Sequence, residues 1–289
     1  MRLIAIDGNS QKLDGGSMFG NCPRALWERW IPPDAKHRID LACRALLIET
    51  NEGKRVLCEA GVGTFFPPEL RARYGVQESD HMLLENLRRN GIEPESIDAV
   101  VLSHLHFDHV GGLLTPWEEG KAPGLVFPKA HYVIGRRAWE RAQAPHPRDR
   151  ASFIADFPAI LQAGAGGRIE LLEDGQGSAI LGEAFSFTFS DGHTPGLVAT
   201  RFTYGEHAVT YPGDLIPGRF WVHAPITMGY DRYPELIIDE KANLLQRLTD
   251  DGSWLFFTHD PTVSASRVRK DARGRFEVYD ECAGAPVFA

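Results

Sequence analysis

Cysteine is scarce in this sequence of 289 residues, and the four cysteines show no C-x-x-C spacing. The sequence therefore indicates neither a zinc knuckle nor a disulfide-stapled scaffold. No stretch approaches the roughly 20 apolar residues of a membrane-spanning helix. The apolar run at the N-terminus is interrupted at Asp7, which is too early for a secretory signal. We therefore expect a cytoplasmic protein with no membrane partner.

Basic residues are also in short supply. The chain has 31 Lys and Arg against 39 Asp and Glu, which gives a formal net charge of −8. Because no block of basic residues could follow a phosphate backbone, we expect no nucleic-acid partner. The hydrophobic fraction of 43% is enough for a chain of this length to bury a stable core.

Apolar segments separated by turn residues predict a mixture of strands and helices. Residues 41–50 and 55–58 are predicted as two strands joined by a turn that contains Asn and Gly. Ser79 is predicted to cap a helix that ends at Gly91, and Pro234 to begin another. We see no composition shift or repeat that would mark a linker, so we expect a single domain over residues 1–289.

Four of the predicted strands are each followed closely by a side chain that can bind a metal ion. The strands are 97–102, 185–190, 208–211 and 254–258, and the side chains are His104, His193, Asp214 and His259. Layered α/β proteins commonly carry their chemistry on loops that a rigid sheet holds in place. The sequence therefore predicts that these four loops meet at one site.

The densest group of potential ligands is His104-Leu105-His106-Phe107-Asp108-His109, which places four of them in six residues. Imidazole and carboxylate groups suit a borderline divalent ion such as zinc. A carboxylate at Asp214 could bridge two cations. Taken singly, His193 and His259 would more often be structural and Asp214 a turn residue, so their candidacy depends on this group.

The order H-x-H-x-D-H, then His, Asp and His, resembles the ligand motifs of the metallo-β-lactamase superfamily. The resemblance implies an α/β fold, the αββα sandwich, in which two mixed β-sheets are flanked by helices. It also implies two divalent metal ions, of which zinc is favoured and iron, cobalt or manganese are alternatives. One ion would be held by His104, His106 and His193, and the other by Asp108, His109 and His259, with Asp214 as the bridge.

An N-terminal segment narrows this resemblance. Leu13-Asp14-Gly15-Gly16-Ser17-Met18-Phe19-Gly20, followed by Leu26-Trp27, is similar to the YtnP-like quorum-quenching lactonases, as is Met228-Gly229-Tyr230-Asp231. The implied reaction is the opening of a lactone ring, such as that of an N-acyl homoserine lactone, by a hydroxide that bridges the metals. Met18, Phe19 and Trp27 would form a hydrophobic lip that binds the substrate. The alternative is that residues 14–20 form a flexible turn from which Met18 and Phe19 pack into the core.

The residues that act on the leaving group are a separate hypothesis. The resemblance implies that Asp108 shuttles the proton. Acyl-homoserine lactonases of the best-known type have a tyrosine three residues after the bridging Asp, where this chain has Pro217. Tyr230 or His223 could replace that missing group as a catalytic residue, although packing or support of a ligand would explain either one equally well.

Other functions share the same residues. A phosphotriester or aryl-ester hydrolase would use the same site, a persulfide dioxygenase would use one iron on three of the ligands, and a metal-containing binding protein would have no turnover. The expected partner is a small-molecule lactone or ester. The apolar pairs Phe65-Phe66 and Phe220-Trp221 would serve a homodimer interface or a substrate wall.

Overall fold

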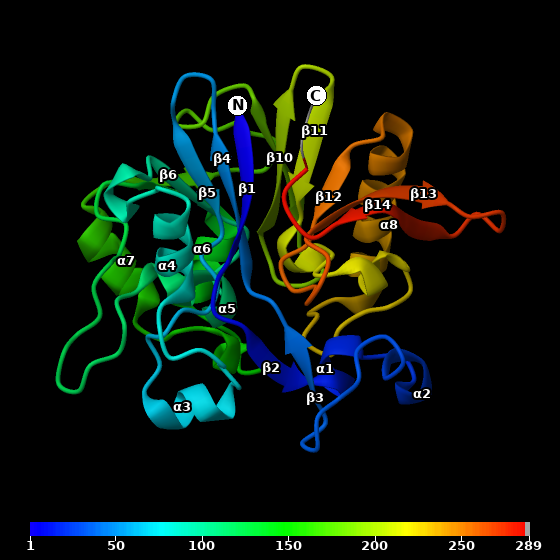
Figure 1. The fold of residues 1–289 in the computed structure, drawn as a ribbon, viewed down its shortest axis with the longest axis horizontal. Coiled ribbons are helices and arrows are strands. Elements are labelled where there is room, and N and C mark those ends of the chain that lie inside the picture. Colours follow the sequence, from blue (N-terminus) through cyan, green and yellow to red (C-terminus); the bar gives the residue numbers. More distant parts are fainter. Residues whose placement is uncertain (287–289) are drawn as a thin grey trace.

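The computed structural model describes residues 1–286, and it contains two six-stranded sheets that lie face to face (Figure 1). The first sheet has the spatial order β1 (Arg2–Asp7), β4 (Arg44–Glu49), β5 (Arg55–Cys58), β6 (Ala99–Leu102), β7 (His131–Gly135) and β8 (Ile169–Leu172). The second has the order β14 (Phe276–Cys282), β13 (Ala265–Lys270), β12 (Trp254–Phe256), β11 (His207–Tyr211), β10 (Leu197–Tyr204) and β9 (Phe185–Ser190). Both sheets contain parallel and antiparallel pairs.

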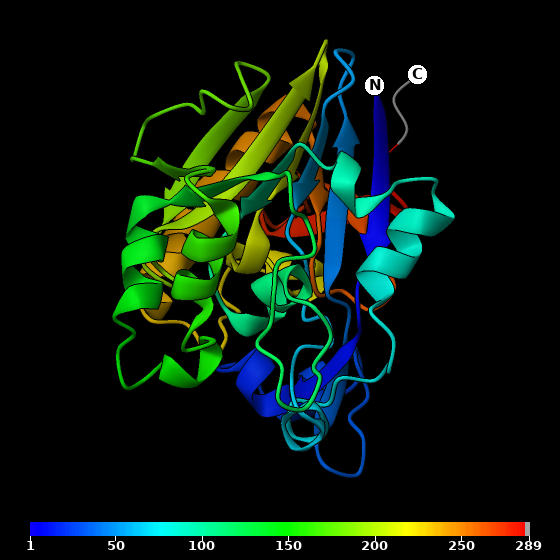
Figure 2. The same cartoon turned by 90° about the vertical axis from the view of Figure 1, so that its left-hand side faces the viewer.

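Helices cover the outer face of each sheet. The first sheet is covered by α4 (Met82–Arg89), α6 (Arg136–Gln143) and α7 (Phe157–Ala165), which lie toward the viewer in Figure 2. The second is covered by α8 (Pro234–Asp251). The four layers confirm the predicted αββα sandwich.

The remaining elements are short. A small sheet of β2 (Gln11–Asp14) and β3 (Arg38–Leu41) lies beyond one end of the two large sheets, together with α1 (Gly15–Phe19), α2 (Arg24–Trp27) and α3 (Pro68–Arg73) (Figure 1). Helix α5 (Phe107–Val110) follows β6. Single 3-10 turns cover Pro94–Ser96, Gly111–Leu113, Arg150–Ser152, Gly213–Leu215 and Arg219–Val222.

The position of strand β6 in the fold explains why each of its residues is apolar. Val100 and Leu102 pack into the hydrophobic cluster under the helices of the first sheet, whereas Ala99 and Val101 pack into the cluster between the two sheets. Successive side chains of a strand point to opposite faces, so a strand covered on both faces needs apolar residues at every position.

The N-terminal half follows its sequence pattern with one correction. The predicted hairpin is confirmed, because β4 and β5 pair antiparallel with Leu46 opposite Cys58. The predicted helix begins at Met82 with His81 at its N-cap, so the predicted cap at Ser79 is wrong. The physical reason is a capping group from elsewhere in the chain: the Met82 amide donates to the Asn9 side chain at 3.1 Å.

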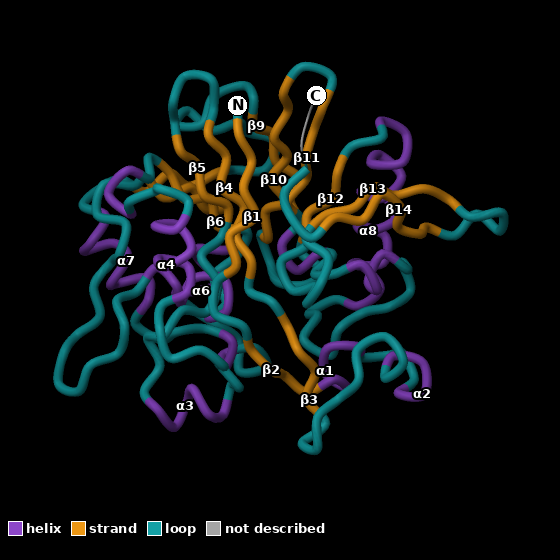
Figure 3. The backbone as a smooth tube through the Cα atoms, in the orientation of Figure 1, coloured by secondary structure: helices purple, strands orange, loops and turns teal. Residues whose placement is uncertain are grey.

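Loops that follow the strands gather at one end of the sandwich, on the side of β2 and β3 (Figure 3). The hairpin turns between β4 and β5 and between β10 and β11 lie at the opposite end, so β5, β11 and the strands parallel to them all end on the loop side. Within residues 1–286, no helix combines the length and the apolar character that a bilayer crossing requires.

The core between the sheets should be sensitive to loss of volume. Phe256 of β12 is fully buried there beside Tyr211, with ring centroids 5.4 Å apart. We expect Phe256→Ala to lower the free energy of unfolding by about 3–5 kcal/mol, because the substitution leaves a cavity that the packed sheets cannot close. Urea unfolding of the metal-free protein measures the change. Leu236→Ala is the control, since Leu236 is 39% exposed and a surface change of this kind stays within about 0.5 kcal/mol; equal effects of the two substitutions would contradict the prediction.

Candidate metal centre

Seven side chains predicted as metal ligands meet at the loop end of the sandwich, and all seven are buried. We call them the ligand cluster: His104, His106, Asp108, His109, His193, Asp214 and His259. The cluster draws on both sheets, because His104 follows β6 of the first sheet while His193, Asp214 and His259 follow β9, β11 and β12 of the second. The predicted convergence of the four loops is therefore observed.

The geometry brings the donor atoms of the cluster together in overlapping groups of three. Ligand atoms of His104, His106 and His193 lie within 4.8 Å of one another, as do those of Asp108, His109 and His259 and those of His104, His109 and Asp214. The first two groups are the sets that the family resemblance implies.

Asp214 lies between the two sets. Its Oδ2 atom is 3.4 Å from His193 Nε2, and its Oδ1 atom is 3.4 Å from His109 Nε2 and 3.2 Å from His259 Nε2. One carboxylate thus offers one oxygen to each set, which is the arrangement that a bridging ligand requires.

Supporting groups hold the ring nitrogens that face away from the cluster. His193 Nδ1 lies 2.9 Å from Asp231 Oδ1, His259 Nδ1 lies 2.7 Å from the Ala42 carbonyl, and His104 Nδ1 lies 2.9 Å from Ser103 Oγ. Such contacts fix the tautomer and the orientation of a ligating imidazole. Each of these rings therefore presents its Nε2 atom to the cluster.

Glu59 is a supporting residue that sequence reasoning missed. Its Oε2 atom lies 2.7 Å from His109 Nδ1, and its Oε1 atom accepts a hydrogen bond from the Ser103 amide at 2.5 Å. The backbone of Glu59 has φ of 69°, in the left-handed region that non-glycine residues rarely adopt. Its position immediately after the buried strand β5 was the available signal, because the predicted ligands also follow strand ends.

Gln11 is a second supporting residue that was missed. It is fully buried, and its Nε2 atom donates to Asp108 Oδ2 at 2.7 Å. Gln11 lies on β2, far from Asp108 in the sequence, so no local pattern could have revealed the contact. The small β2–β3 sheet therefore reaches into the ligand cluster and fixes one carboxylate.

The charges of the cluster compensate one another. Burial alone would raise the pKa of Asp214, but His109 and His259 outweigh it and hold that pKa well below its ordinary value. Burial alone would lower the pKa of His109, but the Asp214 and Glu59 carboxylates raise it well above the ordinary value. By contrast, burial and neighbouring imidazoles hold the pKa values of His104 and His106 well below the ordinary value. The cluster thus combines neutral imidazoles at His104 and His106 with a carboxylate at Asp214 that requires positive charge beside it.

Two buried nitrogens of the cluster, His104 Nε2 and His106 Nε2, have no hydrogen-bond partner among the described residues. A buried polar atom without a partner costs free energy, so its presence in a native site calls for an explanation. These unpaired nitrogens are donor atoms that divalent metals accept. The residues present therefore fit a metal centre.

A comparison with protein families agrees with this geometry. Residues 38–259 match the family model of the metallo-β-lactamase superfamily, which spans all seven residues of the ligand cluster. The chain belongs to the metallo-β-lactamase superfamily. It is a metal-dependent hydrolase of that superfamily, as the sequence analysis predicted.

Individual relatives cover most of the chain. A probable metallo-hydrolase of Mycobacterium bovis is 26% identical over 293 aligned positions, which cover 86% of each chain. Among solved structures, a probable metal-dependent hydrolase from Staphylococcus aureus has a TM-score of 0.83 and 23% identity, covering 96% of this chain and 97% of the other. AidC, a dizinc quorum-quenching lactonase solved with the product N-hexanoyl-L-homoserine, has a TM-score of 0.75 and 24% identity, covering 97% of this chain and 94% of AidC.

A cavity of about 110 Å³ borders the ligand cluster of this hydrolase. Its apolar lining includes Leu13, Met18 and Phe107, and its hydroxyl groups include those of Tyr74 and Tyr230. Of the three residues predicted to form a hydrophobic lip, only Met18 lines this cavity.

Phe19 and Trp27 pack in the core instead. Phe19 is fully buried and stacks between Trp27 and Trp221, at centroid distances of 5.5 Å and 4.5 Å. Consecutive residues of a helix point about 100° apart, so α1 turns Met18 toward the cavity and Phe19 away from it. The structure thus agrees with the alternative of core packing for Phe19, and Trp27, which was predicted only as part of the lip, is buried as well.

The two candidates for the missing catalytic group are placed differently. Tyr230 lines the cavity at the ligand cluster. His223 lines another pocket together with Phe220 and Arg275, so the structure does not bring it to the cluster. The two pockets share no lining residue.

The segment that contains Tyr230 is held by a hydrogen bond from a buried lysine. Lys241 of α8 is 1% exposed, and its Nζ atom donates to the Ile226 carbonyl at 2.5 Å. Asp231, five residues after Ile226, is the carboxylate that supports His193. Burial lowers the pKa of Lys241 to about 7, against a smaller opposing effect of Asp231.

This lysine should make stability depend on pH. An unfolded lysine keeps its proton up to about pH 10.4, whereas folded Lys241 releases it near pH 7. Between these values the unfolded state binds more protons, so the stability of the wild type should rise with pH relative to Lys241→Met, by up to about 1.4 kcal/mol per pH unit. Urea unfolding of both metal-free proteins at pH 7, 8 and 9 measures the difference, and parallel pH profiles would contradict the prediction.

Proposed function

We propose that this protein is a dinuclear metal-dependent hydrolase that opens lactone rings, with N-acyl homoserine lactones as the favoured substrate class. The observation that carries the proposal is the placement of Asp214, whose two carboxylate oxygens face separate groups of imidazoles. A single ion on three ligands, as in a persulfide dioxygenase, would leave the set of Asp108, His109 and His259 without a role.

We propose two ligand sets. His104, His106 and His193 would hold one ion, Asp108, His109 and His259 the other, and Asp214 would bridge them. Zinc is favoured because three imidazoles and a shared carboxylate suit it, and AidC is described as a dizinc enzyme. When bound, two such ions lower the pKa of a water molecule toward neutrality and polarise a carbonyl oxygen.

The chain's own residues would orient the substrate and move the proton. Asp108 is fixed by Gln11 at its Oδ2 atom and borders the cavity, so its carboxylate could carry a proton to the leaving alkoxide. Burial raises the pKa of Tyr230, which keeps its phenol protonated as a hydrogen-bond donor. Tyr230 would then orient the lactone in place of the tyrosine that is absent at Pro217.

The cavity favours a small ring with an apolar extension. Its volume of about 110 Å³ is below the range of roughly 300–1,000 Å³ for pockets that bury a whole ligand. The ring of a lactone would occupy the cavity, and its acyl chain would leave it past Met18 and Leu13. The product in the AidC structure, N-hexanoyl-L-homoserine, combines such a head with an acyl chain.

The first prediction concerns activity and metal content together. The protein loaded with zinc should bind two equivalents per chain and open N-hexanoyl homoserine lactone, which is monitored by proton release. His106→Ala should bind less metal and lose turnover by more than about a hundredfold, the upper range for loss of a residue that only supports a ligand.

This assay has one control variant, and two results would contradict the prediction. His131→Ala removes an exposed histidine at the start of β7 and should change neither the metal content nor the rate. Two bound equivalents without lactone turnover would refute the substrate class and leave the phosphotriester and aryl-ester alternatives on the same site. One bound equivalent would refute the dinuclear centre.

A second prediction concerns Tyr230. We expect Tyr230→Phe to lower kcat/KM for the lactone about tenfold, which corresponds to loss of one hydrogen bond of about 1.4 kcal/mol, with zinc content unchanged. Tyr74→Phe is the matched control in the same cavity, since the Tyr74 hydroxyl already donates to the Ala151 carbonyl at 3.3 Å. An unchanged kcat/KM in Tyr230→Phe would remove Tyr230 from the reaction.

A further inference from the structure

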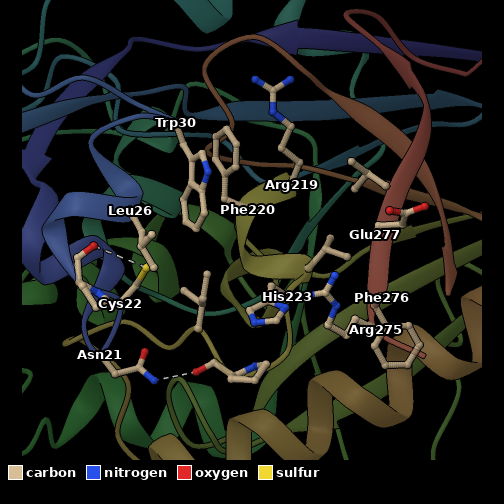
Figure 4. A pocket seen from close by; sticks show the side chains of 15 residues that line it. Asn21, Cys22, Leu26, Trp30, Arg219, Phe220, His223, Arg275, Phe276 and Glu277 are labelled. Atoms are coloured by element: carbon tan, nitrogen blue, oxygen red, sulfur yellow. Dashed lines mark hydrogen bonds between the residues drawn. The ribbon is translucent and has the colours of Figure 1, made fainter. Parts of the chain in front are cut away.

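A second pocket of about 550 Å³ lies apart from the ligand cluster (Figure 4). Its walls come from distant parts of the chain, namely the residues around α2, the segment 219–226 and the start of β14. The volume falls within the roughly 300–1,000 Å³ that enclose small-molecule ligands. Nothing in the proposed reaction uses this pocket.

One wall of the pocket is aromatic and held in place. Trp30 stacks on Phe220 with centroids 5.3 Å apart and planes 5° from parallel. The Arg219 guanidinium lies 4.9 Å from the centre of the Phe220 ring and is itself paired with Glu281 at 3.1 Å. Arg219 therefore stabilises the wall, and its charge is already compensated.

The apolar surface of this wall is unusually exposed. Trp30 is 37% exposed and Leu26 is 47% exposed, and both are among the few large hydrophobic residues that reach solvent within residues 1–286. Exposed apolar residues that gather around a concave surface are typical of a binding site. An apolar part of a ligand would cover them.

The opposite side of the pocket offers hydrogen-bond donors. Arg275 uses Nε and Nη2 to bind Asp271, at 2.8 Å and 2.7 Å, which leaves Nη1 without a partner among the described residues. The His223 side chain lies beside Arg275 in Figure 4 and makes no hydrogen bond within residues 1–286. Burial lowers the pKa of His223, and the positive charges of Arg275 and Lys241 lower it further.

The charged groups of the lining are paired. Glu277 lines the pocket, and its Oε1 atom pairs at 2.8 Å with Arg269, which lies outside the lining. Arg275 pairs with Asp271, yet its Nη1 donor and the His223 imidazole have no partner among the described residues and could both donate to an oxyanion. These two donors favour a ligand that ends in an anionic group over one that ends in a cationic group.

We propose that this pocket binds an amphiphilic carboxylate, with its apolar body against Trp30, Phe220 and Leu26 and its carboxylate at Arg275 and His223. The site is separate from the ligand cluster, since its lining contains no residue of the cluster or of the cavity beside it. Binding does not require the metals or hydrolysis.

The test uses decanoate as the probe and metal-free protein, so that no metal can capture the carboxylate. Calorimetry gives the Kd, and fluorine NMR of protein labelled with 5-fluorotryptophan reports the location, with the Trp30 signal assigned from Trp30→Phe. Decanoate should bind and shift the Trp30 signal, and decan-1-ol and decylammonium should bind at least about tenfold more weakly, which corresponds to about 1.4 kcal/mol.

Substitutions in the pocket test the carboxylate and the apolar body of the proposed ligand separately. Arg275→Gln should weaken decanoate about tenfold and leave decan-1-ol unchanged. Arg273→Gln makes the same charge change two residues away, outside the lining, and should change neither. Leu26→Glu alters an exposed position, so it should fold normally while weakening both probes.

Three outcomes would overturn the proposal. Equal affinity for decanoate and decan-1-ol, unaffected by Arg275→Gln, would remove the anionic group from the ligand. A Trp30 signal that does not move under saturating decanoate would place the binding elsewhere. A dimer in light scattering that Leu26→Glu dissociates would make a second copy of this chain the occupant of the pocket.

Discussion

The buried carboxylate of Asp214 is the constraint on which the rest of the site depends. A charge without partners would be very unfavourable at this depth, and the chain surrounds it with imidazoles from both sheets. Those imidazoles are in turn held by Glu59, Asp231 and the Ala42 carbonyl. Cations at the cluster would therefore add a link between two layers that already meet through apolar packing and through hydrogen bonds, such as that from the Tyr211 hydroxyl to the Arg44 carbonyl at 2.5 Å.

The sequence predicts the fold and the ligand cluster well, for physical reasons that particular residues make clear. Val100 and Val101 pack on opposite faces of β6, and such uninterrupted apolar strands are recognisable without any tertiary information. The ligands follow strand ends, so knowledge of the strands also brings the ligands together. The single domain and the cytoplasmic location stay predictions.

The features that the sequence could not predict depend on contacts between distant segments. Asn9, between β1 and β2, caps the helix in place of Ser79, and Gln11 of β2 orients Asp108. Local sequence patterns contain no information about such contacts. The burial of Phe19 has the same origin, since its ring stacks on Trp221, which lies far away in the sequence.

Glu59 carries a consequence for how this chain can vary. Its left-handed backbone is a conformation that glycine would adopt more easily, yet its carboxylate contacts both the Ser103 amide and His109. Glycine at this position would relieve the backbone strain but would leave the His109 imidazole without its carboxylate. Glutamate keeps that contact at the cost of the strain. The requirements of the backbone and of the metal centre therefore differ at position 59. This position should tolerate fewer amino acids than other positions that are equally buried.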